Sequence, residues 1–119
     1  MKEEEYVEEV VLCASSAYEK KFYLNENFEG LPQHVKDELK IMCVLFTEDV
    51  GGVLSLEFDE NGNLELNTSA DEGDLLYDEI GSVLKIKQMQ QEKQELFESL
   101  ETYYKVFFLG EDIEDDNGD

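Results

Sequence analysis

The stretch LSLEFDENGNLELN, residues 54–67, decides the fold class of this 119-residue chain. Apolar residues alternate with polar ones on both sides of a turn: Leu54, Leu56 and Phe58 before it, Leu64 and Leu66 after it. Such alternation is typical of strands with one buried face. A two-residue turn would split the apolar faces, whereas a three-residue loop over 60–62 keeps one face apolar. The sequence therefore predicts a β-hairpin with Gly62 in the left-handed position of its turn.

The turn of this hairpin also begins like an EF-hand calcium loop, starting at Asp59. The likeness fails where the calcium site depends on it most. Leu64 stands where the loop requires glycine, and Ala70 stands where it requires a bidentate glutamate. We therefore interpret the stretch as a hairpin turn.

Before the hairpin, Gly30-Leu31-Pro32 interrupts the chain and predicts a new helix, since proline suits the first helical position. One helical face carries apolar residues at the expected spacing: Val35, Leu39, Met42, Cys43 and Phe46. The other side carries further ones: Ile41, Val44 and Leu45. We therefore expect the second half of this helix to lie in the core and to stop at Gly51-Gly52. The run 40–46 alone also fits a buried strand, which would add a member to the sheet.

The first segment, from Glu3 to Glu19, is predicted to form a helix. Its apolar residues fall on one helical face: Tyr6, Val7, Val10, Cys13, Ala14, Ala17 and Tyr18. Acids begin the segment and Lys20-Lys21 ends it, as the helix dipole favours. The short aromatic stretch Phe22–Leu24 then predicts an edge strand.

From Leu75 to Leu109 no strong helix breaker occurs, so the sequence predicts a long C-terminal helix. At the usual rise it would span about 50 Å, more than a compact domain of this size. We therefore expect it to project, to bend near Gly81 or to pack against a second copy. Together these elements predict an α+β fold: a small antiparallel sheet, made of the hairpin and the edge strand, packed by helices. Residues 1–110 would form one domain and 111–119 a disordered acidic tail.

The charge of the chain excludes several functions. It has 31 acidic residues against nine lysines and no arginine, giving a formal net charge of −22. Nucleic-acid binding requires clustered basic side chains, and an anionic membrane surface would repel this chain. No run of 18 apolar residues is present, and the N-terminus does not resemble a signal peptide. We expect a cytoplasmic protein whose 41% hydrophobic residues suffice for a core.

Residues able to carry catalysis are scarce. The single histidine, His34, falls in the first turn of a predicted helix, where we expect it to be exposed. A Ser/His/Asp or Cys/His arrangement would have to use it. Cys13 and Cys43 lack CxxC spacing and are expected to be buried free thiols. No cofactor is predicted, and we lean towards a protein that is not an enzyme.

Clustered carboxylates are weak candidates for a divalent-metal site, since hard cations prefer oxygen ligands. They lie in the loop after the hairpin and just beyond it: Asp71, Asp74 and Asp78. Helix capping and solvated surface acids are the alternative interpretation. Glu48 and Asp49 lie at a predicted helix C-terminus, where acids oppose the dipole. Such a broken rule can mark function; the alternative interpretation is that the acids are tolerated or that the helix ends earlier.

The last helix offers two candidate interaction surfaces. A row of acids recurs every three residues and could face a basic partner: Glu92, Glu95, Glu98 and Glu101. The end of the helix is apolar nearly all round and could form a homodimer interface: Tyr103, Tyr104, Phe107 and Phe108. A solvated face is the alternative interpretation of the acidic row.

Three stretches carry a resemblance to a known family: LFTEDVGG (Leu45–Gly52), LYDEIGS (Leu76–Ser82) and ELFESLETYYKVFFLGE (Glu95–Glu111). They resemble an uncharacterised family of small acidic proteins from anaerobic Gram-positive bacteria. The resemblance implies a bacterial cytoplasmic protein and brings no activity, cofactor or site residue.

Three functions remain compatible with the sequence. The first is a non-enzymatic interaction or adaptor protein, homodimeric, that binds a basic protein. The second is a carboxylate-rich protein that binds divalent metal or a metal-dependent hydrolase. The third is an inhibitor that imitates the charge of a nucleic acid.

Overall fold

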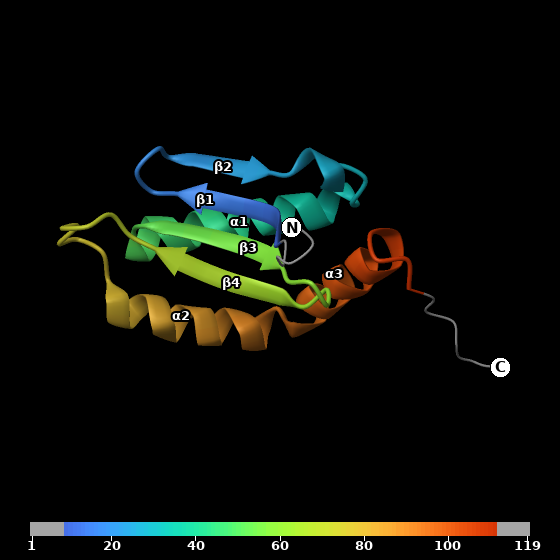
Figure 1. The fold of residues 1–119 in the computed structure, drawn as a ribbon. Helices are drawn as coiled ribbons and strands as arrows, with labels where there is room; N and C mark the ends of the chain where they lie inside the picture. The colour runs from blue at the N-terminus through green and yellow to red at the C-terminus, as the bar shows by residue number, and fades with distance from the viewer. Residues whose placement is uncertain (1–8, 112–119) are drawn as a thin grey trace, which may run out of the picture.

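Four antiparallel strands form one sheet in the order β2-β1-β3-β4, with the helices against one of its faces (Figure 1). The structure is a computed structural model that describes residues 9–111. Its strands are β1 (Val10–Ser16), β2 (Lys21–Leu24), β3 (Val53–Phe58) and β4 (Leu64–Ser69). Its helices are the 3-10 helix η2 (Glu26–Phe28), α1 (Gln33–Val50), α2 (Glu79–Glu92) and α3 (Gln94–Phe107). The predicted α+β class is confirmed. Residues 1–8 and 112–119, which hold the start of the predicted first helix and most of the predicted tail, lie outside the described part.

The hairpin of β3 and β4 has the predicted register, in which Phe58 pairs with Leu64. Gly62 has a φ of 87°, the left-handed conformation expected of it. The stretch that resembles a calcium loop binds its own backbone instead. The Asp59 carboxylate accepts the N–H of Asn63 at 2.9 Å, and this bond lowers the pKa of Asp59. The interpretation as a hairpin turn is confirmed.

The helix predicted over Glu3–Glu19 is wrong, because residues 10–16 form β1, a central strand of the sheet. A β-bulge accounts for the misleading pattern. The pairing with β3 shifts between Val11 and Cys13, so that Leu12 and Cys13 are adjacent and both fully buried. Two neighbouring buried residues break the alternation of a strand and resemble helical spacing. The predicted edge strand is confirmed as β2, and the sheet gains β1 as a fourth member.

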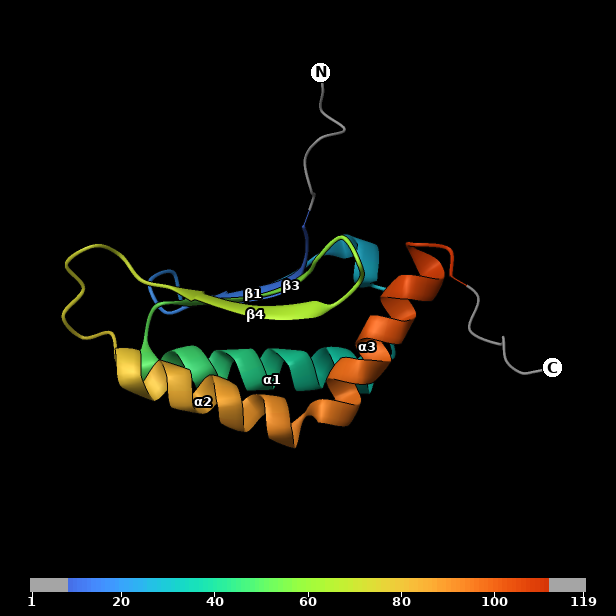
Figure 2. The ribbon, with the colours of Figure 1, turned by 60° about the horizontal axis from the view of Figure 1, so that its bottom comes forward.

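Helix α1 confirms the helix predicted after Pro32, and the alternative of a strand over 40–46 is wrong. It lies beneath the sheet, with its buried Leu39, Cys43 and Phe46 in the core (Figure 2). The sequence predicts that the second half of α1 lies in the core, but only one of its sides is buried. Ile41 and Leu45 are each 59% exposed, because they lie on the side of α1 opposite those core residues.

The C-terminal helical segment consists of two helices, α2 and α3, which meet at Lys93. Lys93 has φ −109° and ψ 22°, so the break falls there and not near Gly81. Helix α2 runs beside α1, whereas α3 turns steeply towards the end of the sheet (Figure 2). This turn brings Tyr104 onto Phe58, with ring centroids 4.2 Å apart and planes 6° from parallel.

The end of α1 yields a test of backbone strain, since Gly51 and Gly52 have φ of 87° and 70°. Gly51 also has a ψ of −171°, a backbone region almost restricted to glycine, so we expect Gly51→Ala to lower the free energy of unfolding by about 1–3 kcal/mol through strain alone. A Cβ on Gly52 would lie 2.5 Å from the Ser69 carbonyl oxygen, so Gly52→Ala should cost a further ~1–3 kcal/mol. Urea denaturation of both variants measures the difference. Equal losses would contradict the close approach of β4 to the helix end.

Candidate functional site

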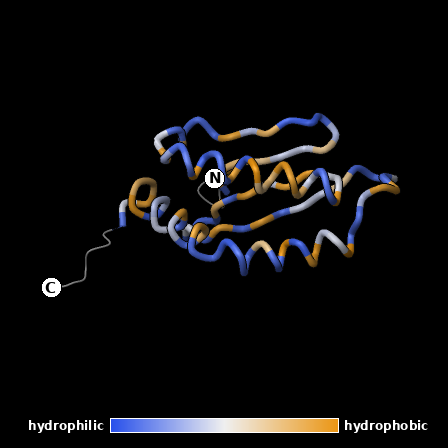
Figure 3. The backbone as a smooth tube through the Cα atoms, turned by 180° about the vertical axis from the view of Figure 1, so that it is seen from behind, coloured by the Kyte–Doolittle hydropathy of each residue, from blue (hydrophilic) through white to orange (hydrophobic). Residues whose placement is uncertain are grey.

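A groove of about 480 Å³ lies between α1 and α2, and we call it the α1–α2 groove. Its apolar residues come from both helices: Ile41, Met42, Leu45 and Phe46 from α1, and Met89 from α2. Met42 and Phe46 are buried, whereas Ile41 and Leu45 are exposed. Figure 3 shows hydrophobic residues along the same two helices. The groove therefore presents accessible apolar surface above an apolar floor.

Two ion pairs hold α2 beside α1. Lys93 Nζ lies 2.8 Å from Glu38 Oε2, and Lys85 Nζ lies 2.8 Å from Asp49 Oδ2. The hydrogen bond and charge of Asp49 raise the pKa of Lys85, so its cation is favoured. The position of Asp49 at a helix C-terminus, which opposes the dipole, therefore has a structural explanation. Both lysines that line the groove are thereby neutralised.

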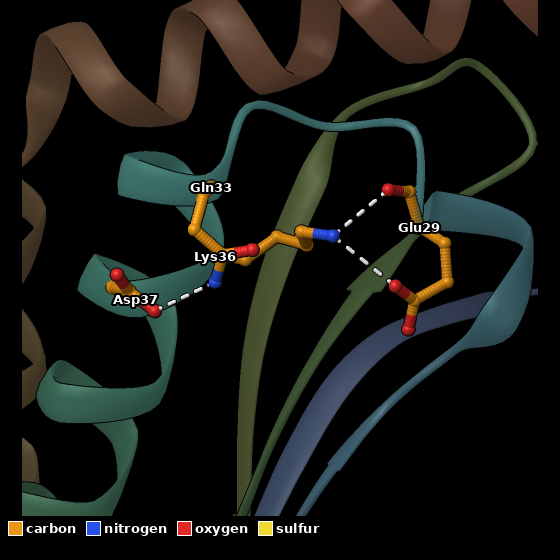
Figure 4. A network of polar contacts seen from close by, with 4 residues as sticks. All are labelled: Glu29, Gln33, Lys36 and Asp37. Carbon is orange, nitrogen blue, oxygen red and sulfur yellow. Dashed lines mark hydrogen bonds and ion pairs between the residues drawn. The ribbon is translucent and has the colours of Figure 1, made fainter.

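The rims of the groove keep uncompensated negative charge. Asp37 accepts a hydrogen bond from the neutral Gln33 amide at 2.9 Å (Figure 4). The neighbouring cation, Lys36, turns to the Glu29 carbonyl and carboxylate oxygens at 2.9 and 3.1 Å. On the opposite rim Glu92 is likewise bound by a neutral amide. An apolar groove with carboxylate rims suits an apolar ligand that carries positive charge.

The break at Lys93 divides the acidic row predicted as a partner surface between two helices. Glu92 ends α2, while Glu95, Glu98 and Glu101 lie on α3 beyond the break at Lys93. Glu101 Oε2 accepts the backbone N–H of Leu64 at 2.8 Å, at the start of edge strand β4. Its carboxylate thus satisfies a strand edge, and of the row only Glu92 lines the groove.

The four aromatic residues predicted as a dimer interface have different surroundings. Tyr104 is 5% exposed and belongs to the core, while Tyr103 is half-buried against it. Phe108 stacks on Tyr104 with ring centroids 5.0 Å apart. Phe107 is 70% exposed and is the member of the set that presents most surface to a partner.

The three candidate metal ligands are engaged in local structure. Tyr18 Oη donates to Asp74 Oδ2 at 2.5 Å, which lowers the pKa of Asp74, and accepts the N–H of Asp71 at 2.9 Å. Asp78 caps α2 by accepting the Gly81 N–H at 2.8 Å. Within residues 9–111 no group of three or more His, Cys, Asp or Glu residues is arranged to hold a metal ion.

The histidine and the thiols do not meet. His34 is exposed at the end of the α1–α2 groove, as predicted. Cys13 and Cys43 are fully buried free thiols with their Sγ atoms 3.9 Å apart, which confirms the prediction for them. Their mutual hydrogen bond and then burial raise the pKa of Cys13 well above its usual range. The neutral thiol is therefore strongly favoured, which is unsuited to a nucleophile.

Sequence reasoning missed the groove, although one signal pointed to it. The second half of α1 is apolar on more faces than a single sheet can cover, and the surplus residues are Ile41 and Leu45. The same surplus marks the start of α2, where Ile80 and Leu84 are 75% and 61% exposed. Helices with apolar residues beyond the stripe that meets the core indicate a second contact surface.

Comparison with known proteins gives a family but no activity. Within residues 9–111 no helix is long and apolar enough to cross a membrane. No curated protein and no solved structure matches the chain. A family model matches residues 9–112, which include every strand and helix described above. The chain belongs to that family, the family of unknown function DUF6145.

Proposed function

We propose that this protein is a non-enzymatic interaction protein whose α1–α2 groove holds a basic amphipathic helix of a partner protein. The observation that carries the proposal is the pair Ile41 and Leu45, each 59% exposed beside the apolar floor of the groove. They lie four residues apart on one side of α1. An amphipathic helix docks into such a groove by apolar side chains one turn apart. Methionine, present on both sides at Met42 and Met89, adapts to irregular apolar partners.

Charge complementarity favours a basic partner over a second copy of this chain. The full chain has a formal net charge of −22, and both rims of the groove carry carboxylates bound by neutral amides. A second copy would bring the same negative charge to the groove. A helix flanked by lysine or arginine would instead be attracted, more strongly at low ionic strength.

Peptide binding tests this proposal. The probe is a labelled amphipathic peptide of roughly 18 residues, about five helical turns, with leucines on one face and lysines elsewhere. Its control carries glutamate at every lysine position. We expect fluorescence anisotropy to show saturable binding of the lysine peptide, weakened by salt, and none of the glutamate peptide. Equal binding of both peptides, or of neither, would contradict the proposal.

Substitutions in the groove give the sharper result. Ile41→Asn together with Leu45→Asn should weaken binding of the lysine peptide about 100-fold, from ~1.5 kcal/mol of lost burial at each position and with no change of charge. Ile80→Asn together with Leu84→Asn is the matched control, because both side chains are exposed on α2 but do not line the groove. Both proteins should fold, since the substituted side chains are exposed. If the groove variant and the control variant bind the lysine peptide with similar affinity, the peptide binds outside the α1–α2 groove.

The homodimer predicted from the sequence remains a separate proposal, now centred on the exposed Phe107. Sedimentation tests it: a monomer independent of concentration at micromolar levels would contradict it. Calorimetry with calcium, magnesium and manganese tests the alternative of a metal-binding protein or hydrolase. The bacterial source, the cytoplasmic location and the nucleic-acid mimic also stay predictions.

A further inference from the structure

A second hollow, of about 740 Å³, lies between the β1–β2 turn and the C-terminal half of α1. Lys20 and Lys21 from the turn and Lys40 from α1 line it, with Leu76 from the loop before α2. Three of the nine lysines in a strongly acidic chain therefore converge on one cavity. We propose that this lysine cavity, defined by Lys20, Lys21 and Lys40, binds a small organic phosphate.

The three lysines are available to a ligand. Within residues 9–111 the ion pairs of lysine are made by others: Lys36, Lys85 and Lys93. The acids that line the cavity are Glu48 and Asp49, and Asp49 is already paired with Lys85. The lysines thus outnumber the acids free to neutralise them. The cavity lining is therefore positively charged, although the chain as a whole is strongly negative.

Within residues 9–111 no hydrogen bond joins these lysines to the C-terminal carbonyls of α1. A helix C-terminus attracts cations to its unpaired carbonyl groups. One of those carbonyls has a backbone donor from outside the helix, since Val50 accepts the N–H of Asp78 at 3.0 Å. The positive charge is therefore left for another anion.

The turn that presents the lysines is held in a costly conformation. Lys20 has a φ of 54° and is the one residue other than glycine with positive φ among residues 9–111. Neighbouring contacts fix the turn: Ala17 N–H donates to the Gly52 carbonyl at 2.8 Å, and Tyr18 Oη binds Asp74. Strain that is held in this way is typical of binding sites.

The interior of the cavity suits a phosphate with an apolar body. The hydroxyls of Ser15 and Thr47 lie 2.8 Å apart and are almost fully buried. The Thr47 hydroxyl donates to the carbonyls of Cys43 and Val44 at 3.3 and 3.2 Å, so Ser15 donates to Thr47, and the pair forms a polar inner wall of the cavity. Phe22 and Val44 supply apolar wall. Lysine ammonium groups bind phosphate as point charges, and the volume is in the range of ligand pockets.

Calorimetry with phenyl phosphate, inorganic phosphate and phenol tests the assignment. We expect saturable binding of phenyl phosphate, weaker binding of inorganic phosphate and none of phenol. Lys20→Gln with Lys21→Gln should weaken phenyl phosphate at least about tenfold. The matched control is Lys87→Gln with Lys105→Gln, which changes the net charge equally but lies outside the cavity lining, and it should bind as the unaltered protein does.

Three results would overturn the proposal. The first is no saturable binding of phenyl phosphate up to about 10 mM, a concentration that reveals even weak affinity. The second is an equal loss in both double variants, which would assign binding to overall charge. The third is that inorganic phosphate binds as tightly as phenyl phosphate, which would show that an apolar group on the ligand contributes nothing to binding.

Discussion

Phe58→Ala is expected to lower the free energy of unfolding by about 3–5 kcal/mol, a large part of the stability of a domain this size. Phe58 is fully buried at the end of β3. The centroid of its ring lies 4.2 Å from that of Tyr104 on α3 and 5.8 Å from that of Phe28 on η2. Alanine would leave a cavity where these three elements meet. Urea denaturation, followed by circular dichroism, measures the loss.

The matched control is Phe107→Ala, which removes the same ring from a position that is 70% exposed. We expect this variant to lose less than about 1 kcal/mol. Hydrogen exchange adds a local test, because the stack between Phe58 and Tyr104 fixes α3 against the sheet. In Phe58→Ala the amides of α3 should exchange faster relative to those of α1. A small loss of stability, or uniform exchange, would mean that α3 is held by other contacts.

Sequence reasoning succeeded where neighbouring residues decide the structure. The hairpin follows from strict alternation and from Gly62, and both act within a few residues of the turn. It failed in β1, because the bulge at Leu12 depends on pairing with β3, some forty residues away along the chain. It also failed at Lys93, whose break lets Tyr104 reach Phe58. Tertiary contacts outweigh local propensity at such places.

Both proposed binding surfaces arise from residues that only the fold brings together. The α1–α2 groove needs α2 to lie beside α1, and the ion pair of Lys93 with Glu38 that holds it there spans 55 residues. The lysine cavity brings Lys20 and Lys21 beside Lys40. The sequence pattern places the first two at the end of one predicted helix and Lys40 in another. The composition of α1 predicts more apolar surface than one sheet can cover, but it does not predict which neighbouring element lies beside that surface or how much of it stays exposed. The spacing of apolar residues within one helix identifies its apolar face but does not identify the element that packs against that face.

The thiols of Cys13 and Cys43 are expected to react with iodoacetamide at least about 1,000-fold more slowly in the native protein than in urea. Both side chains are fully buried, and their mutual hydrogen bond and burial raise the pKa of Cys13, so the reactive thiolate is suppressed. Reaction must then wait for unfolding, and ~5 kcal/mol of stability limits the open population to about one molecule in several thousand. Mass spectrometry of timed samples measures the rate.

An exposed cysteine supplies the reference rate within the folded chain. Gln91→Cys on α2 should be labelled as fast as a free thiol, while Cys13 and Cys43 in the same molecule stay unlabelled. Both thiols are fully buried and the pKa of Cys13 is raised, so mild peroxide should leave both reduced. Rapid labelling or a disulfide would reveal an opening between β1 and α1 and would make the pair a redox site. Slow labelling of both would assign them to packing between sheet and helix.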